Sequence, residues 1–208
     1  MKKYIFAAAL CFAAASTFAQ TKIAIKGGYN YSTARVSVYE QAKPTGYNSG
    51  YGLGLLFKAP FDGYLHFSPY IMYNKRGFKY NQQSNPDSAY NSSLHYIDIV
   101  PALSIDFPTG KTSAFVVSAG FNLSVGIAGT EKLTANGVTT SKKIKFDVSS
   151  NYGLFDLGLN TSIGYHFDKF LVEAGYNLGL ADINNQYDKD GRNMRNRMLS
   201  FSVGYYIR

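Results

Sequence analysis

Long segments in which every second residue is apolar restrict this chain to β-structure. In the stretch FVVSAGFNLSVGIAG, residues 115–129, Phe115, Phe121 and Ile127 share one face, while Asn122 and Ser124 share the other. Side chains of a strand alternate between two faces, so a period of two indicates strands. The pattern predicts eight strands, at about residues 22–34, 48–59, 63–78, 94–107, 115–129, 152–167, 169–181 and 196–208.

A soluble lipocalin-like or sandwich fold also alternates, but three features favour a membrane barrel. The segments are longer than the usual five or six residues of a soluble strand, and a tilted strand needs about 9 to 11 residues to cross a bilayer. The polar face carries Gly, Ser and Asn, which suit a narrow barrel interior. Aromatic residues such as Tyr51, Phe67, Phe155 and Tyr205 stand near the ends of the apolar faces, as in interfacial girdles. We therefore predict an all-β fold, an eight-stranded antiparallel transmembrane up-and-down β-barrel.

Short and long connections alternate strictly. APFDG, PTGK and DK are tight turns, whereas about 35–47, 79–93, 128–151 and 182–195 are predicted to be long polar loops. Transmembrane barrels have short periplasmic turns and longer extracellular loops. We therefore expect both termini in the periplasm, the long loops outside, and a location in the outer membrane of a Gram-negative bacterium.

The first residues, MKKYIFAAALCFAAASTFAQ, have the pattern of a secretory signal peptide. Basic residues precede a short apolar run, and small residues end it. We predict a cleaved signal at residues 1–19 and one barrel domain at residues 20–208. A membrane anchor needs a longer apolar run, and a lipoprotein site at Cys11 would need a small residue in place of Leu10.

Composition excludes several function classes. Cys11 is the only cysteine and lies in the predicted signal, so we expect neither disulfides nor thiol chemistry in the exported chain. Without Lys2 and Lys3, 19 basic residues face 13 acidic ones, a formal charge of +6. They form no block of five or more like charges, which disfavours a nucleic-acid partner.

Charged residues on the small-residue faces are expected to fill the lumen. An eight-stranded barrel is just wide enough for side chains, and buried charges need partners. We predict a structural network of ion pairs and hydrogen bonds; a path for small solutes or protons is the alternative. The residues of this predicted lumen network are Lys26, Lys58, His66, Asp98, Asp106, Asp156, Glu173 and Arg208.

No enzymatic, cofactor-binding or metal-binding motif is found, and we expect none of these activities. The chain has three histidines and lacks HExxH, GxSxG and paired-cysteine patterns. The glycine pairs have no following helix, so nucleotide binding is not indicated. The one enzymatic alternative is a lipid-modifying site at the outer rim, built from Ser92, Ser93 and His95.

Basic residues of the predicted outer loops suggest a lipid contact. Lysine and arginine just outside an outer leaflet can pair with the phosphates of lipopolysaccharide; ordinary solvated loops are the alternative. The candidate lipopolysaccharide-facing residues are Lys132, Lys142, Lys143, Lys145, Arg192 and Arg195.

Several motifs in order resemble the outer-membrane β-barrel proteins of Bacteroidetes, the porin-family and PorT-like barrels. They are IKGGYNYST, GYGLGLLFK, SPYIMYNKRGF, YIDIVPALSIDF, GYNLGLADIN and RNRMLSFSVGYYIR, which together cover most of the predicted barrel. Such barrels commonly end on an aromatic residue, whereas this chain ends Ile207-Arg208.

The resemblance implies a monomeric barrel in outer-membrane lipid and lipopolysaccharide, with a structural or surface-interaction role through its long loops. The PorT likeness adds envelope protein partners, as in a secretion complex, and a small-solute pore is the other alternative.

Overall fold

A computed structural model describes residues 21–81, 88–147, 152–185 and 191–207 of the chain. The predicted signal peptide lies outside these residues. The described strands are β1 (Lys22–Val38), β2 (Gln41–Lys43), β3 (Gly46–Asp62), β4 (Leu65–Phe67), β5 (Tyr70–Asn81), β6 (Ser88–Val100), β7 (Ala102–Pro108), β8 (Ser113–Ala135), β9 (Val138–Ile144), β10 (Phe155–Phe167), β11 (Phe170–Gly179) and β12 (Arg192–Tyr206).

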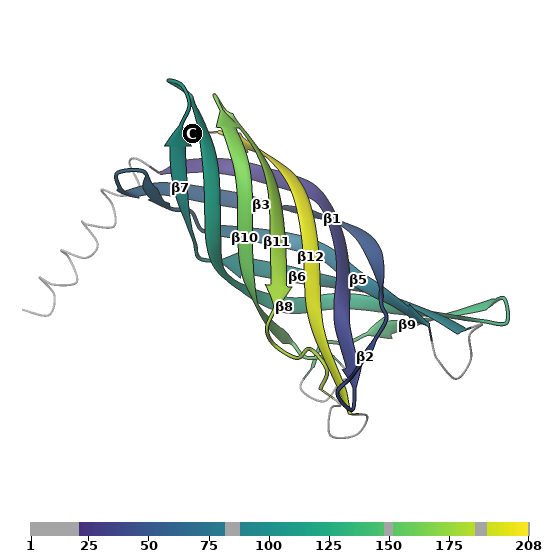
Figure 1. The fold of residues 1–208 in the computed structure, drawn as a ribbon. Helices are drawn as coiled ribbons and strands as arrows, with labels where there is room; N and C mark the ends of the chain where they lie inside the picture. The colour runs from purple at the N-terminus through teal and green to yellow at the C-terminus, as the bar shows by residue number, and fades with distance from the viewer. Residues whose placement is uncertain (1–20, 82–87, 148–151, 186–190, 208) are drawn as a thin grey trace, which may run out of the picture.

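The strands close into a ring because the first and last pair with each other (Figure 1). β1 pairs with β12 from Ala24↔Tyr206 to Val38↔Arg192 and with β3 on its other side. The ring continues through β5, β6, β8, β10 and β11 back to β12, every pairing being antiparallel. This closure leaves no unpaired edge along the ring, as a strand structure in hydrocarbon requires.

Two prolines explain why short strands appear inside the ring. Pro69 separates β4 from β5, and Pro101 separates β6 from β7. Proline has no N–H to donate to a ladder, but Ser68 N donates to Ala102 O at 2.8 Å and keeps the two sides joined. β4 with β5 therefore forms one wall of the barrel and β6 with β7 the next. The described part of the ring thus has eight walls, and the predicted fold class is confirmed.

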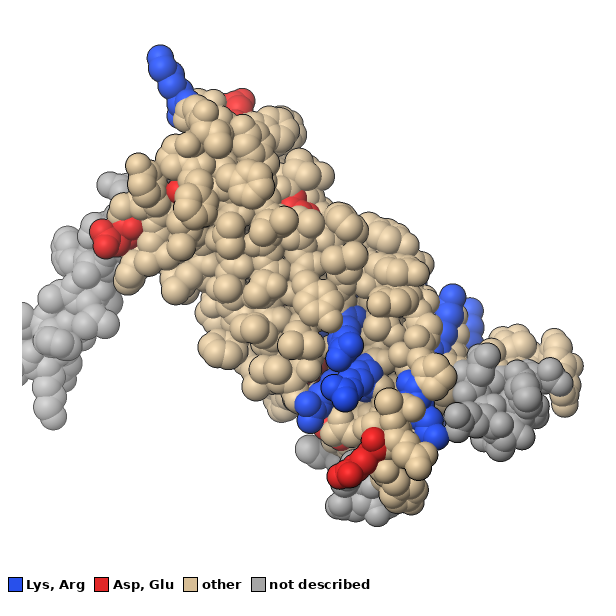
Figure 2. Space-filling model, in the orientation of Figure 1, with Lys and Arg blue, Asp and Glu red and all other residues tan. Residues whose placement is uncertain are grey.

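Exposure alternates along the strands as the sequence predicts. On β10, Phe155 is 69% exposed and Ile163 54%, whereas Asp156 is 3% and Asn160 7% exposed. Exposed apolar side chains over a whole outer surface suit hydrocarbon rather than water. Figure 2 agrees for the outer surface, because the middle of the visible face carries few charged side chains.

Three tight connections mark one end of the barrel, here named the turn end. Gly63 and Tyr64 join β3 to β4, residues 109–112 join β7 to β8, and Asp168 with Lys169 joins β10 to β11. Gly63 and Asp168 take positive φ angles, 54° and 50°, as tight hairpins require. The three predicted turns are confirmed.

At the opposite end, here named the hairpin end, the predicted long loops are wrong in extent. β1 runs to Val38, β5 to Asn81, and β8 to Ala135 with β9 returning to Ile144. Asn136 and Gly137 make the β8–β9 turn with φ angles of 51° and 77°. An Asn-Gly pair between alternating segments is a strong hairpin signal, so this turn was visible in the sequence. Figure 1 shows this hairpin projecting beyond the ring.

A β-bulge interrupts the predicted fifth strand. Tyr96 pairs with Gly126, but His95 pairs with Ala128, so Ile127 is the extra residue. Ile127 and Ala128 are both exposed. The alternation of residues 115–129 thus ends at Ile127, and β8 continues beyond the bulge in a changed register.

The described residues contain no helix of sufficient length and apolarity to cross a membrane.

Candidate functional site

In the described part of the chain, three groups of charged side chains lie in the lumen, the space that the ring encloses. The first lies at the turn end, where Lys58 of β3 meets Asp106 of β7. Lys58 Nζ is 2.5 Å from Asp106 Oδ1 and 2.6 Å from Oδ2. His66 Nδ1 lies 3.8 Å from the same carboxylate and 3.0 Å from the carbonyl oxygen of Tyr64. This group closes the lumen next to the tight turns.

The second group joins Lys26 of β1 to Glu173 of β11. Lys26 Nζ donates to Glu173 Oε2 at 2.8 Å, and the side chains are 8% and 11% exposed. The ammonium also lies 4.7 Å from the ring centre of Tyr70, within range of a cation–π contact. The pair thus connects β1 and β11, which lie on the two sides of β12 in the ring.

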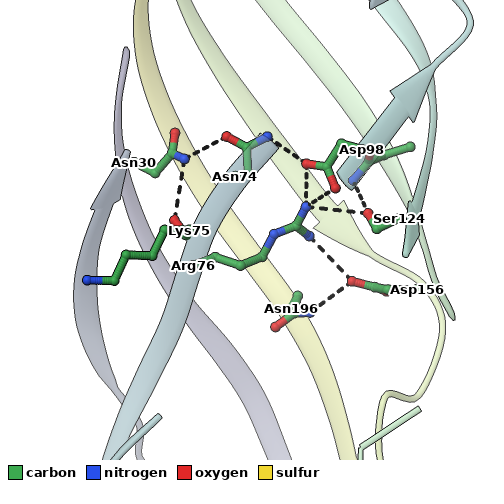
Figure 3. Close-up of polar contacts among 9 residues, drawn as sticks. Asn30, Asn74, Lys75, Arg76, Asp98, Ser124, Asp156 and Asn196 are labelled. Carbon is green, nitrogen blue, oxygen red and sulfur yellow. Dashed lines mark hydrogen bonds and ion pairs between the residues drawn. The ribbon is translucent and has the colours of Figure 1, made fainter. Parts of the chain in front are cut away.

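The third group centres on Arg76 of β5 (Figure 3). Its guanidinium pairs with Asp98 of β6 and lies 3.4 Å from Asp156 Oδ2 of β10. The three side chains are 1–2% exposed. The guanidinium carbon also lies 4.5 Å from the ring centre of Tyr96. One buried cation therefore holds two buried carboxylates from two other walls.

Carboxamides extend this third group across the lumen. Asn74 donates to Asp98 at 2.6 Å, and Asn30 donates to Asn74 at 2.8 Å. Asn196 of β12, two strands away from β10 in the ring, donates to Asp156 at 2.8 Å. Figure 3 shows the chain of contacts running from β1 through β5 to β6 and β10. Such a buried network fixes the relative positions of the walls.

A small polar cavity lies between the second and third groups. It is lined by Lys26, Asn74, Asp98, Glu173, Asn177 and neighbouring residues, and the space open to the centre of a water molecule is ≈ 20 Å³. One water needs about 10–15 Å³ on the same measure. Asn177 is 2% exposed and neither polar atom of its amide has a partner within the protein. The cavity therefore fits about one water bound by Asn177.

Aromatic side chains close the lumen at the hairpin end. The Phe146 ring packs edge-on against Tyr96, at 5.4 Å between ring centres, and against Tyr152, at 6.3 Å. A Cβ added to Gly126 would come within 2.3 Å of the Phe146 ring, so only glycine leaves space for it. Burial, and secondarily the Glu131 carboxylate, raises the pKa of the Tyr152 hydroxyl. It therefore stays protonated, and it donates to Glu131 at 3.4 Å.

The structure places seven of the predicted lumen residues in these three groups, and Arg208 lies outside the described residues. Lys26, Lys58, His66, Asp98, Asp106, Asp156 and Glu173 all contact a lumen partner. Sequence reasoning missed Arg76. Its even number in the predicted 63–78 strand, the parity of inward-facing Met72 and Asn74, was the signal that could have found it.

Five of the six candidate lipopolysaccharide-facing residues lie on strands, where the sequence predicted loops. Lys132 is on β8, Lys142 and Lys143 are on β9, and Lys145 directly follows β9. Arg192 begins β12, its side chain lying outside the described part, and Arg195 is exposed on the same strand.

The alternative lipid-modifying site does not assemble. Ser92 is fully buried inside the barrel, near the Tyr152 hydroxyl. His95 points to the opposite face, where its Nδ1 lies 2.5 Å from the Tyr73 hydroxyl oxygen. The odd separation of Ser92 and His95 along one strand keeps them apart. Ser93 lies on the same face as His95, but the Nδ1 atom of His95 is already hydrogen-bonded to Tyr73.

Within the described ranges, no group of three or more His, Cys, Asp or Glu side chains could hold a metal ion.

The family described as "Outer membrane protein beta-barrel domain" matches residues 18–185 of the chain. No curated protein matches significantly in sequence. Among solved structures, this chain is similar to Ail, the attachment invasion locus protein of Yersinia pestis, solved in complex with the heparin analogue sucrose octasulfate. The two are 13% identical with a TM-score of 0.44, and the match covers 90% of this chain and 99% of Ail. OprG of Pseudomonas aeruginosa is 11% identical (TM-score 0.47, coverage 90% and 96%), and Neisserial surface protein A is 16% identical (0.45, 88% and 96%).

Proposed function

The chain belongs to the outer membrane protein β-barrel domain family, and on this premise we propose that it is a closed outer-membrane anchor that presents its hairpin end at the cell surface. The observation that carries the proposal is the filled lumen. Three ion-pair groups and the Phe146 cluster occupy it, and the described cavity fits about one water. A barrel with a filled lumen can hold the hairpin end at the membrane surface, but it leaves little room for ions or solutes to pass.

The strands that extend beyond the ring at the hairpin end are the parts of the molecule left to contact other molecules. β5, β6, β8 and β9 continue past the ring as one sheet, paired from Asn81↔Ala89 to Ala135↔Val138. We assign this end to the outside, because transmembrane barrels place short turns in the periplasm and longer segments outside. A monomer suffices for this role, since the ring closes on itself.

Two measurements test the anchor role. Purified protein in planar bilayers should give no steady single-channel conductance; regular open-channel steps would refute the closed lumen. Cysteine variants test the orientation, since Cys11 lies in the predicted signal. A membrane-impermeant maleimide should label Thr139→Cys on intact cells and leave Lys111→Cys unlabelled until lysis. The reverse pattern would refute the orientation.

A second candidate, a component of an envelope complex, is favoured by the free edge of β9. The described part of β9 pairs only with β8, and an unpaired strand edge can accept a strand from another protein. The sequence resemblance to Bacteroidetes and PorT-like barrels supports this candidate. An affinity pull-down should recover a stoichiometric partner that is lost when residues 133–140 are replaced by Asn-Gly; recovery of none would count against it.

We propose no enzymatic role and no cofactor, because the one candidate site, Ser92 with His95, is divided between two faces. Lipopolysaccharide is the proposed lipid partner, through basic residues at the hairpin end.

A further inference from the structure

Three arginines gather on the outer surface of β1 and β12, near the hairpin end. Arg35 is the direct partner of Arg195 across the two strands, and Arg197 pairs with Thr33. Arg195 and Arg197 are two residues apart and so share one face. Figure 2 shows basic side chains gathered toward this end of the visible face, where Figure 1 places β1 and β12. We name Arg35, Arg195 and Arg197 the wall arginines.

The wall arginines point away from the lumen. Ala34 is fully buried and Asn196 is 2% exposed, so the residues between and beside the arginines fill the inner face. Arg35 and Arg195 are exposed, and Arg197 is half-buried. The guanidinium groups are therefore available to a ligand outside the barrel.

Their height above the apolar belt runs from the headgroup layer of the membrane to just outside it. Tyr31 and Leu199 pair at the edge of the apolar belt, and the Tyr31 ring stacks on Tyr47 at 4.5 Å. From that pair, Arg197 is two residues further along and Arg195 four. At ~3.4 Å per residue and a tilt of ~40°, these steps rise roughly 5 and 10 Å. The headgroup layer is roughly 5–7 Å thick on each side, so the backbone of Arg197 lies within it. The backbones of Arg195 and its partner Arg35 lie a few ångström beyond it, on the side away from the acyl chains.

In the described part of the chain, no carboxylate balances the charges of the wall arginines. Among the described residues, none of the three forms an ion pair with a carboxylate. Like charges directly opposite each other on a sheet repel and destabilise it, as Arg35 and Arg195 do here. A phosphate between two guanidinium groups would remove this repulsion, since arginine binds phosphate in a bidentate manner.

We propose that the wall arginines bind the phosphate groups of lipopolysaccharide in the outer leaflet. The proposal rests on the proposed function, because it requires the hairpin end to face outside, and it names the site of the lipid contact. The tyrosines below the arginines pack against the acyl chains, and the arginines hold the phosphorylated sugar above them. The lipid thus neutralises a basic patch that would otherwise repel itself.

The lysines of the β8–β9 hairpin fit this role less well. Lys142 lies opposite Glu131 across the hairpin, which supplies a carboxylate close by. Lys132 and Lys143 belong to the paired part of β8 and β9, and Figure 1 shows this hairpin projecting beyond the ring. These lysines provide a matched control, since they lie at the same end and carry the same charge.

The test measures binding of lipid A by the full-length exported chain refolded in detergent. The variant R35Q/R195Q/R197Q is compared with K132Q/K142Q/K143Q, which removes equal charge. The lipids are lipid A with its phosphates and the same lipid A after their chemical removal. Each basic residue near an anionic surface changes binding about fivefold, so the arginine variant should bind phosphorylated lipid A about 100-fold more weakly. The lysine variant should stay within about threefold of wild type, and removal of the phosphates should weaken wild type as much as the arginine variant does.

Equal loss in both variants, or equal binding of both lipids by wild type, would overturn the proposal. Gel migration before and after heating shows that each variant is folded, so misfolding is not mistaken for lost binding. Failure of the proposed function is read separately. The wall arginines lie outside the lumen, so conductance is independent of them, and maleimide labelling reports orientation without lipid.

Discussion

Replacing Arg76 by methionine should destabilise the barrel strongly, because two carboxylates share this one guanidinium. The side chains of Arg76, Asp98 and Asp156 are 1–2% exposed, so the change leaves both carboxylates buried without their cation. Removing one partner of a buried ion pair typically costs about 3–5 kcal/mol. Asn74 and Asn196 still donate to the carboxylates, so we expect the lower part of that range, about 3 kcal/mol.

The matched control is the triple variant R76M/D98N/D156N, which removes all three charges with little change of volume. Replacing a whole buried charge group by neutral residues is often close to neutral, so this variant should recover most of the lost stability. The assay is urea unfolding in lipid vesicles, followed by far-ultraviolet circular dichroism and by gel migration. The chain has no tryptophan, so indole fluorescence cannot report. An R76M variant within about 1 kcal/mol of wild type, or a triple variant as unstable as R76M, would refute the reasoning.

Three further predictions use other parts of the barrel. Gly126→Val should displace the Phe146 ring, because its Cβ would lie 2.3 Å from that ring, and it should lower the free energy of unfolding by about 1–3 kcal/mol. The control Gly27→Ala, whose Cβ would keep ordinary contact distances, should change the urea midpoint little. Equal midpoints for the two variants would contradict this prediction. Lys58→Met should cost less than Arg76→Met in the same assay, because the Asp106 side chain it leaves is 15% exposed and water can reach it; a larger loss would show that the turn end is the drier one. Replacing residues 133–140 by Asn-Gly should leave the midpoint unchanged, since Leu133 and Thr140 pair with each other beyond the ring; a lower midpoint would mean that the projecting hairpin supports the barrel.

The barrel class was predictable because membrane and lumen impose opposite demands on alternate residues. Phe155 and Asp156 show this directly, one 69% and the other 3% exposed. The tight turns were also predictable, since Asp168 and Gly63 stand where positive φ angles are needed. The hairpin at Asn136-Gly137 was readable in principle, but its polar surroundings concealed the strands.

The lumen contacts were only partly predictable. Parity places Lys26, Asp98 and Glu173 inside, yet the pairing of Lys26 with Glu173 depends on the shear of the barrel. The bulge at Ile127 was not predictable from alternation. The residues around it, Gly126 and Ala128, are small and uncharged, so the change of face leaves no signal in the sequence. Arg35 and Arg195 lie in two segments that the sequence assigned to loops, and Arg197 lies in the predicted last strand. Their shared face became visible only through the register of β1 and β12.

The pairing of β1 with β12 has a consequence for biogenesis. These strands come from opposite ends of the described chain and are joined by a continuous ladder from Ala24↔Tyr206 to Val38↔Arg192. The barrel therefore cannot seal until the last strand has been synthesised and exported. Until then β1 and β11 each offer an open edge that would template aggregation. Contacts between such distant segments also form slowly, so we expect the unsealed chain to depend on a factor that covers both edges until β12 pairs with β1.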